Sequence, residues 1–219
     1  MLHQGAPTPQ LRQWLERLAP VVEHARDVLR QRCPDEVARC SGCQRTLAGD
    51  FQLEFLRRPY VIEARSFAVR ATGGAKPPSP FTTSLILTYL AMADGAPLAG
   101  DWIGFRELPA GLFYAQAFQG YSGGRLVREP GGDLEAFRCA AGRLGARPLA
   151  VGDAAYAFGV LPRIPLAVVY WEGDDEFPSQ AQVLFDRSAP HYMTTDGLAI
   201  LGSQLVDRLL ASGSPGASG

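Results

Sequence analysis

The stretch LPRIPLAVVYWEGDDEFPSQAQVLFDRSAPHYM, residues Leu161–Met193, decides the fold because two apolar segments flank an acidic turn within it. The segment Leu166–Glu172 is apolar enough to form a central strand. Beyond the turn, Ala181, Val183 and Phe185 alternate with other residues, which predicts a further strand. The stretch therefore predicts a late hairpin followed directly by a loop that carries a histidine.

Similar patterns on either side of this hairpin extend the sheet. The segment Ala155–Leu161 is another apolar strand, and Pro162 and Pro165 confine the turn after it because proline cannot donate to a strand ladder. Earlier in the chain, Asp50–Leu56 and Tyr60–Arg70 predict a β-hairpin. Strands thus come early and late in the chain.

Helices are expected between and around these strands. Residues 8–32 have helical spacing, and Pro20 predicts a bend or a restart there because its ring clashes with the preceding turn. Residues 96–132 are irregular, so only short elements are expected in them. The other predicted helices are Pro80–Met92 with Ser79 as its N-cap, Asp133–Leu144, and a last helix that begins near Asp196 as its N-cap and ends near Leu210.

This order of elements differs from the repeating βαβ order of a doubly wound sheet. It predicts an α+β fold with an antiparallel sheet and helices packed mainly on one face. The chain has 219 residues, of which 47% are hydrophobic, so we expect a single domain over residues 1–210 and a disordered tail over residues 211–219.

Composition excludes several functions. A net charge of −1 without a dense basic run argues against nucleic-acid binding. No stretch reaches the roughly 18 apolar residues of a membrane span, and no export signal is recognisable. We therefore expect a cytoplasmic protein without a membrane or nucleic-acid partner.

Three kinds of residue could carry chemistry. Cys33, Cys40 and Cys43 form C-x6-C-x2-C, which could hold zinc or an iron–sulfur cluster, although a closed site needs a fourth ligand and incidental thiols are the simpler interpretation. The acidic run over residues 172–176 could hold a hard cation, although a solvated hairpin loop is the simpler interpretation. His191 is the best single candidate, because it lies between a strand and a helix and could bind a metal, a tetrapyrrole or a proton.

The segments ADGAPLAGDWIGFRELPAGLFYAQAF, LPRIPL, YWEGDDEFP and FDRSAPHY resemble the domain-of-unknown-function 3786 family of prokaryotes. The resemblance extends from the early hairpin to the last helix. It implies a role near tetrapyrrole or redox metabolism, with a corrinoid or redox protein as the expected partner, because members sometimes carry an iron–sulfur module of the type found beside corrinoid proteins.

We therefore expect a non-catalytic accessory protein that binds haem or a corrinoid between the late hairpin and the histidine loop. The histidine would be the axial ligand, the tryptophans would pack on the macrocycle, and the arginines would pair with its acid groups. The expected site comprises His191, which is also the expected metal ligand, with Trp171, Trp102, Arg106, Arg187 and Asp186.

Two alternatives remain open. One is a metal-dependent enzyme that acts on a small substrate, with His191 as the general base and the acidic turn as a cation site. The other is an interaction subunit without a ligand, whose exposed aromatic side chains serve a partner surface.

Overall fold

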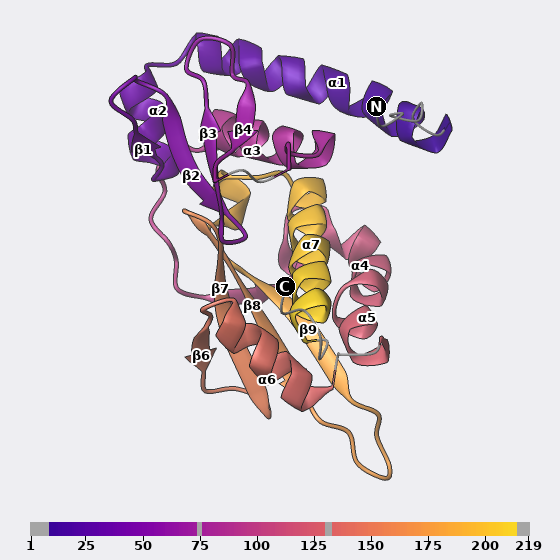
Figure 1. The fold of residues 1–219 in the computed structure, drawn as a ribbon. Coiled ribbons are helices and arrows are strands. Elements are labelled where there is room, and N and C mark those ends of the chain that lie inside the picture. The colour runs from indigo at the N-terminus through magenta and orange to yellow at the C-terminus, as the bar shows by residue number, and fades with distance from the viewer. Residues whose placement is uncertain (1–8, 74–75, 130–132, 214–219) are drawn as a thin grey trace, which may run out of the picture.

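The computed structural model describes residues 9–73, 76–129 and 133–213, with side chains from residue 18 onward. Its strands form two antiparallel sheets, and helices pack against each of them (Figure 1). The predicted α+β class is confirmed, but the strands that we expected in one sheet are divided between two.

The first sheet has the strand order β1-β2-β3-β4. Its strands are β1 (Gln44–Arg45), β2 (Phe51–Phe55), β3 (Arg58–Ile62) and β4 (Val69–Ala71). The predicted hairpin is β2 and β3, joined by Leu56 and Arg57, which both have positive φ. The predicted strand Tyr60–Arg70 is interrupted, because the chain turns at Glu63, whose carbonyl accepts a hydrogen bond from the N–H of Phe67.

The second sheet has the strand order β5-β9-β8-β7-β6. Its strands are β5 (Trp102–Gly104), β6 (Arg147–Leu149), β7 (Ala154–Leu161), β8 (Ile164–Trp171) and β9 (Gln180–Asp186). As the alternation predicted, Ala181, Val183 and Phe185 of β9 are buried. The register places Trp171 opposite Gln180 at one end of β9 and Trp102 opposite Asp186 at the other.

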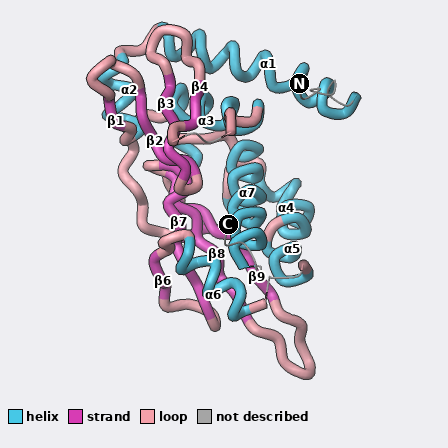
Figure 2. The backbone as a smooth tube through the Cα atoms, in the orientation of Figure 1, coloured by secondary structure: helices cyan, strands magenta, loops and turns pink. Residues whose placement is uncertain are grey.

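Helix α5 (Gly123–Arg128) packs on β9 and α6 (Leu134–Arg143) on β7, and α7 (Thr195–Gly213) packs against both of these helices (Figure 2). Ser79 caps its helix as predicted, accepting a hydrogen bond from the N–H of Thr82. Asp133, expected as the first residue of its helix, is the N-cap and accepts from the N–H of Ala136. The helices are α1 (Pro9–Arg30), α2 (Pro34–Ser41), α3 (Pro80–Met92), α4 (Ala115–Tyr121), α5 (Gly123–Arg128), α6 (Leu134–Arg143) and α7 (Thr195–Gly213), with 3-10 turns η1 (Phe105–Glu107), η2 (Gly111–Tyr114) and η3 (Ala189–His191).

Of the bend or restart predicted at Pro20, the restart is excluded, because α1 is one helix through that residue. The proline lies on the exposed side of α1, while the opposite side packs on α3. Thr194, rather than Asp196, caps α7, because its hydroxyl accepts a hydrogen bond from the N–H of Gly197. Residues 211–213 of the predicted tail belong to α7, and residues 214–219 lie outside the described residues.

The two sheets meet around α3. The N–H of Leu56, in the β2–β3 turn, donates to the carbonyl of Val160 in β7 over 2.9 Å. The hydroxyl of Tyr89 in α3 donates to the carbonyl of Ser41 and accepts from the N–H of Arg163. The first bond joins the two sheets directly, and the other two tie α2 and the turn between β7 and β8 to α3. Among the described residues, no helix has the length and apolar character needed to cross a membrane.

Candidate functional site

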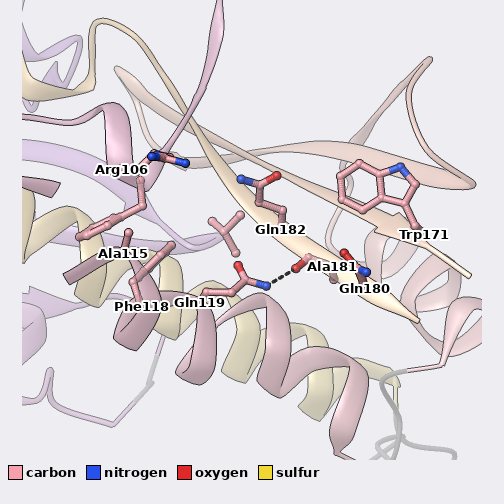
Figure 3. Close-up of a pocket in the computed structure, with 10 residues that line it drawn as sticks. Arg106, Ala115, Phe118, Gln119, Trp171, Gln180, Ala181 and Gln182 are labelled. Atoms are coloured by element: carbon pink, nitrogen blue, oxygen red, sulfur yellow. Dashed lines mark hydrogen bonds between the residues drawn. The ribbon is translucent and has the colours of Figure 1, made fainter. Parts of the chain in front are cut away.

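A pocket lies where β5 leaves β9. Strand β5 pairs only with Leu184–Asp186, so the other end of β9 has no strand on that side among the described residues. The chain instead passes through η1 and η2 into α4, and a cavity of about 320 Å³ remains between these segments and β9 (Figure 3). We call it the β9 pocket. It is lined by Phe105, Arg106, Ala115, Phe118, Gln119, Trp171, Gln180, Ala181, Gln182 and Val183.

The apolar part of the β9 pocket is rigidly packed. The rings of Phe105 and Phe118 stack with centroids 4.3 Å apart, and Phe118 also lies 5.7 Å from the buried ring of Phe185. A Cβ on Gly202 of α7 would come within 2.8 Å of the Phe118 ring, so the absence of a side chain there leaves room for it. Aromatic stacking of this kind fixes the shape of the apolar wall.

The polar part contains one cation and three amides. Arg106 is exposed and forms no ion pair with another described residue, and no described carboxylate lines the pocket. Gln119 donates from Nε2 to the carbonyl of Ala181 over 2.8 Å. Arg106 and Trp171 lie on opposite sides of Gln182 (Figure 3), so a ligand could touch a guanidinium at one end and an indole at the other.

Asp186 lies at the far end of β9 and serves a structural purpose there. Its buried carboxylate accepts hydrogen bonds from the N–H groups of Ala99 and Gly100, at 3.0 and 2.8 Å, and from the N–H and hydroxyl of Ser188. Burial by itself raises the pKa of Asp186, but these hydrogen bonds outweigh it and hold the pKa below the ordinary 3.8.

The residues after Asp186 contact the loop that contains Ala99 and Gly100. Arg187 donates from Nε to Asp101 over 2.7 Å, and the hydroxyl of Tyr192 donates to the carbonyl of Ala96. His191 Nδ1 lies 2.7 Å from an oxygen of Asp94. Residues 186–192 thus form a clamp on residues 94–101, the crossover between the two sheets; we call this the crossover clamp.

The predicted site residues therefore fall into two groups. Trp171 and Arg106 line the β9 pocket, whereas Trp102, Asp186, Arg187 and His191 belong to the end of β9 that carries the crossover clamp. Six residue steps of β9 separate Trp171 from Trp102 in the register, which corresponds to about 20 Å. The structure does not bring the two tryptophans onto one ligand face.

His191 keeps one ring nitrogen available. Its side chain is 53% exposed, and the hydrogen bond of Nδ1 to Asp94 leaves Nε2 directed elsewhere. A carboxylate on Nδ1 orients an imidazole for ligation or proton transfer through Nε2. That hydrogen bond, with a second from the N–H of Ala96, also lowers the pKa of Asp94.

The cysteines and the acidic run do not assemble into a ligand set. Cys33 is exposed, whereas Cys40 and Cys43 are buried, and burial raises the pKa of the Cys43 thiol. Asp174 accepts hydrogen bonds from the N–H groups of Glu176 and Phe177, as in an ordinary turn. Within the described part of the chain, no three His, Cys, Asp or Glu residues are grouped so that they could hold a metal ion.

Sequence reasoning missed the amides of the β9 pocket. The alternation in β9 places Gln180 and Gln182 on the face opposite Ala181 and Val183, so the sequence contained a signal for these two amides. Nothing in the sequence indicated that Gln119, about 60 residues earlier in the chain, would reach the same strand. The aromatic residues Phe105, Phe118 and Trp171 line the pocket, whereas Tyr170, the neighbour of Trp171 in β8, is buried against Phe137.

Comparison with known proteins gives a family and nothing more. Neither a curated protein nor a solved structure matches the chain. The family match covers residues 34–208, from the first residue of α2 into α7, and so includes both sheets and the whole β9 pocket while leaving α1 outside. The chain therefore belongs to the family described as Domain of unknown function (DUF3786).

Proposed function

We propose that this protein is an accessory binding protein that holds a small organic acid in the β9 pocket. The observation that supports this most is Arg106, a guanidinium at a pocket whose described lining contains no carboxylate. An arginine fork binds a carboxylate through two parallel hydrogen bonds. An unpaired arginine in a cavity with no lining carboxylate is therefore suited to an anionic ligand.

Binding without catalysis is the simpler role for this pocket. Its described lining holds arginine, glutamine, tryptophan, phenylalanine and small apolar residues. None of these side chains exchanges a proton near neutral pH or acts as a common nucleophile. The pocket can thus recognise a ligand, but it offers no general acid or base.

Haem or a corrinoid, the ligand predicted from the sequence, remains a candidate for this pocket. Such a molecule could place an acid group on Arg106 and a ring against Trp171. His191 would not be the axial ligand in that position, because it lies with the crossover clamp.

A second candidate uses His191 itself. Asp94 holds Nδ1 and the ring is half exposed, so Nε2 could ligate a haem or corrinoid metal, or act as the general base of a metal-dependent enzyme. This candidate needs a ligand site separate from the β9 pocket.

Absorption spectra with added haemin or hydroxocobalamin distinguish the two sites. Binding in the β9 pocket should weaken in Arg106→Gln and persist in His191→Ala, whereas axial ligation by His191 should show the reverse. Arg147→Gln is the matched control, since Arg147 is exposed on β6 at the opposite edge of the same sheet. If no tetrapyrrole or organic acid binds, the proposed function is wrong.

The proposed setting is the cytoplasm, with a corrinoid or redox protein as partner. Turn η2 supports an interaction surface, because Leu112, Phe113 and Tyr114 are 62, 85 and 61% exposed beside the β9 pocket. Contiguous exposed apolar side chains commonly mark such surfaces. The variant Phe113→Ser should weaken capture of that partner and leave ligand titrations unchanged.

A further inference from the structure

We infer that the ligand of the β9 pocket is a flat aromatic or heteroaromatic molecule with a single carboxylate, bound with its acid group on Arg106 and its ring against Trp171. This inference rests on the proposed function and specifies the ligand of the same pocket. It follows from the charge, the shape and the hydrogen-bonding groups of the described lining.

Charge limits the ligand to one acid group. Arg106 is the one cation among the described lining residues, none of those lining residues is a carboxylate, and Arg106 forms no ion pair with a described residue; the neighbouring Glu107 accepts a hydrogen bond from the N–H of Gly104 instead. A metal ion would find no anionic ligand in this lining, since hard cations need several oxygen ligands. A polyphosphate would lack the several donors that its charge requires. A single carboxylate matches a single guanidinium.

Shape limits the ligand to a small flat molecule. The cavity of about 320 Å³ is at the lower end of the range for small-molecule sites, which begins near 300 Å³. One wall is the stacked pair Phe105 and Phe118, and Trp171 is 38% exposed at the other end. Aromatic walls favour a ring that can stack or meet them edge-on. A macrocycle of four pyrroles would extend well beyond this space.

The amides favour heteroatoms on the ring. Gln180 and Gln182 form no side-chain hydrogen bond with another described residue, so their amides can both donate and accept. Gln119 is committed to the carbonyl of Ala181. Two available amides beside an aromatic wall could orient ring nitrogens or hydroxyl groups.

A peptide strand is a poorer fit because the edge of β9 is covered. The Gln119 amide caps the Ala181 carbonyl, and a Cβ on Gly123 would lie only 1.9 Å from the same oxygen. The start of α5 therefore sits on the position where an added strand would bond. This cover leaves the pocket beside the edge for a small molecule.

The test uses pairs of flat probes, such as quinoline-3-carboxylate and nicotinate, each with its neutral carboxamide. Binding to the full-length protein is followed on the indole N–H signal of Trp171 in ¹H–¹⁵N spectra, assigned by its loss in Trp171→Phe. We expect at least one acid to bind about tenfold more tightly than its amide, the scale of a charged hydrogen bond.

Two variants and a control examine the role of Arg106. Arg106→Gln should abolish the preference for the acid over its amide. Gln182→Glu should do the same with almost no change in shape, because it gives Arg106 an internal carboxylate. Arg147→Gln should bind like the wild type, and circular dichroism should show that all three variants are folded.

The possible outcomes separate the inference from the proposed function. If no acid of the panel binds more tightly than its amide, but haemin or an aliphatic acid binds in an Arg106-dependent manner, the inference is wrong and the proposed function stands. If none of these molecules shifts the Trp171 signal, both are wrong. An acid preference that survives Arg106→Gln would also overturn the inference.

Discussion

At Asp186, four hydrogen bonds from three residues converge on one buried carboxylate. Two of the donors belong to the crossover between the sheets, and two belong to Ser188 in the next turn. A buried charge is tolerated only when it is satisfied in this way. Asp186 therefore holds the crossover in place, and its neighbours Arg187 and His191 add exposed contacts to the same loop.

Replacing Asp186 should destabilise the protein. In Asp186→Asn an amide N–H₂ group would face backbone donors, so we expect a loss of about 2 kcal/mol or more in the free energy of unfolding. Urea unfolding at pH 7 measures this loss in the free energy of unfolding. Asp175→Asn, in the exposed β8–β9 turn, is the matched control and should change stability by less than about 0.5 kcal/mol. Equal effects of the two variants would contradict the structural role of Asp186.

The same carboxylate predicts a pH dependence. Because the folded state holds the pKa of Asp186 below 3.8, its contribution is fully present well above that pH and is lost as the pH falls through the folded pKa. The stability difference between wild type and Asp186→Asn should therefore shrink below about pH 4. Urea midpoints measured from pH 7 to pH 3 show this, and a constant difference would be evidence against it.

His191 should contribute little to stability. Its pair with Asp94 is more than half exposed, and such pairs are worth about 0–1 kcal/mol. A double-mutant cycle with His191→Ala and Asp94→Ala should therefore give a coupling below about 1 kcal/mol. A coupling of several kcal/mol would contradict this expectation and would make the pair an essential part of the crossover clamp.

At the scale of elements, two consecutive glycines fit α5 to its neighbours, Gly123 to β9 and Gly124 to α4. A Cβ on Gly123 would meet the carbonyl oxygen of Ala181, and one on Gly124 would lie 2.9 Å from the carbonyl oxygen of Gln119. Backbone atoms cannot withdraw as flexible side chains can. The contact keeps α4 and α5 against the edge of β9, and α4 provides the wall of the pocket.

Gly123→Ala and Gly142→Ala form a matched pair. The first should destabilise by about 1–3 kcal/mol through overpacking and weaken ligand binding in the β9 pocket. The second adds a methyl group at an exposed position of α6 with nothing within 4 Å, so it should stabilise by about 0.5–1 kcal/mol. Thermal unfolding compares them, and a tolerated Gly123→Ala would contradict the close approach.

The sequence predicts well those elements whose structure is determined by residues close together in the chain. The alternation of Ala181, Val183 and Phe185 determines β9, and the Ser79 hydroxyl determines the start of α3. The β9 pocket could not be predicted in this way, because its residues come from four separate elements, η1, α4, β8 and β9. FDRSAPHY looked like a ligand loop because its polar residues follow a strand, but most of their partners lie about 90 residues earlier in the chain.

At the scale of the whole molecule, α1 lies outside the family match but is part of the core. Its residues Ala25 and Leu29 are buried, and it packs along α3, whose own Ile86, Leu87 and Leu90 are fully buried. Helix α3 is also tied to β7–β8 through Tyr89 and Arg163. A substitution that destabilises α1 should therefore also destabilise the second sheet, because α3 connects the two.

Leu29→Ala tests this connection. Removing a large side chain that is 3% exposed should lower the free energy of unfolding by about 2–5 kcal/mol, whereas Val21→Ala, at a position that is 45% exposed, should change it little. In a Trp14→Phe background, fluorescence reports Trp102 and Trp171 in the second sheet, and circular dichroism reports the whole chain. Both signals should shift together in urea, because two-state unfolding makes different probes coincide. A shift in circular dichroism alone would show that α1 and α3 unfold independently of the sheet that holds the β9 pocket.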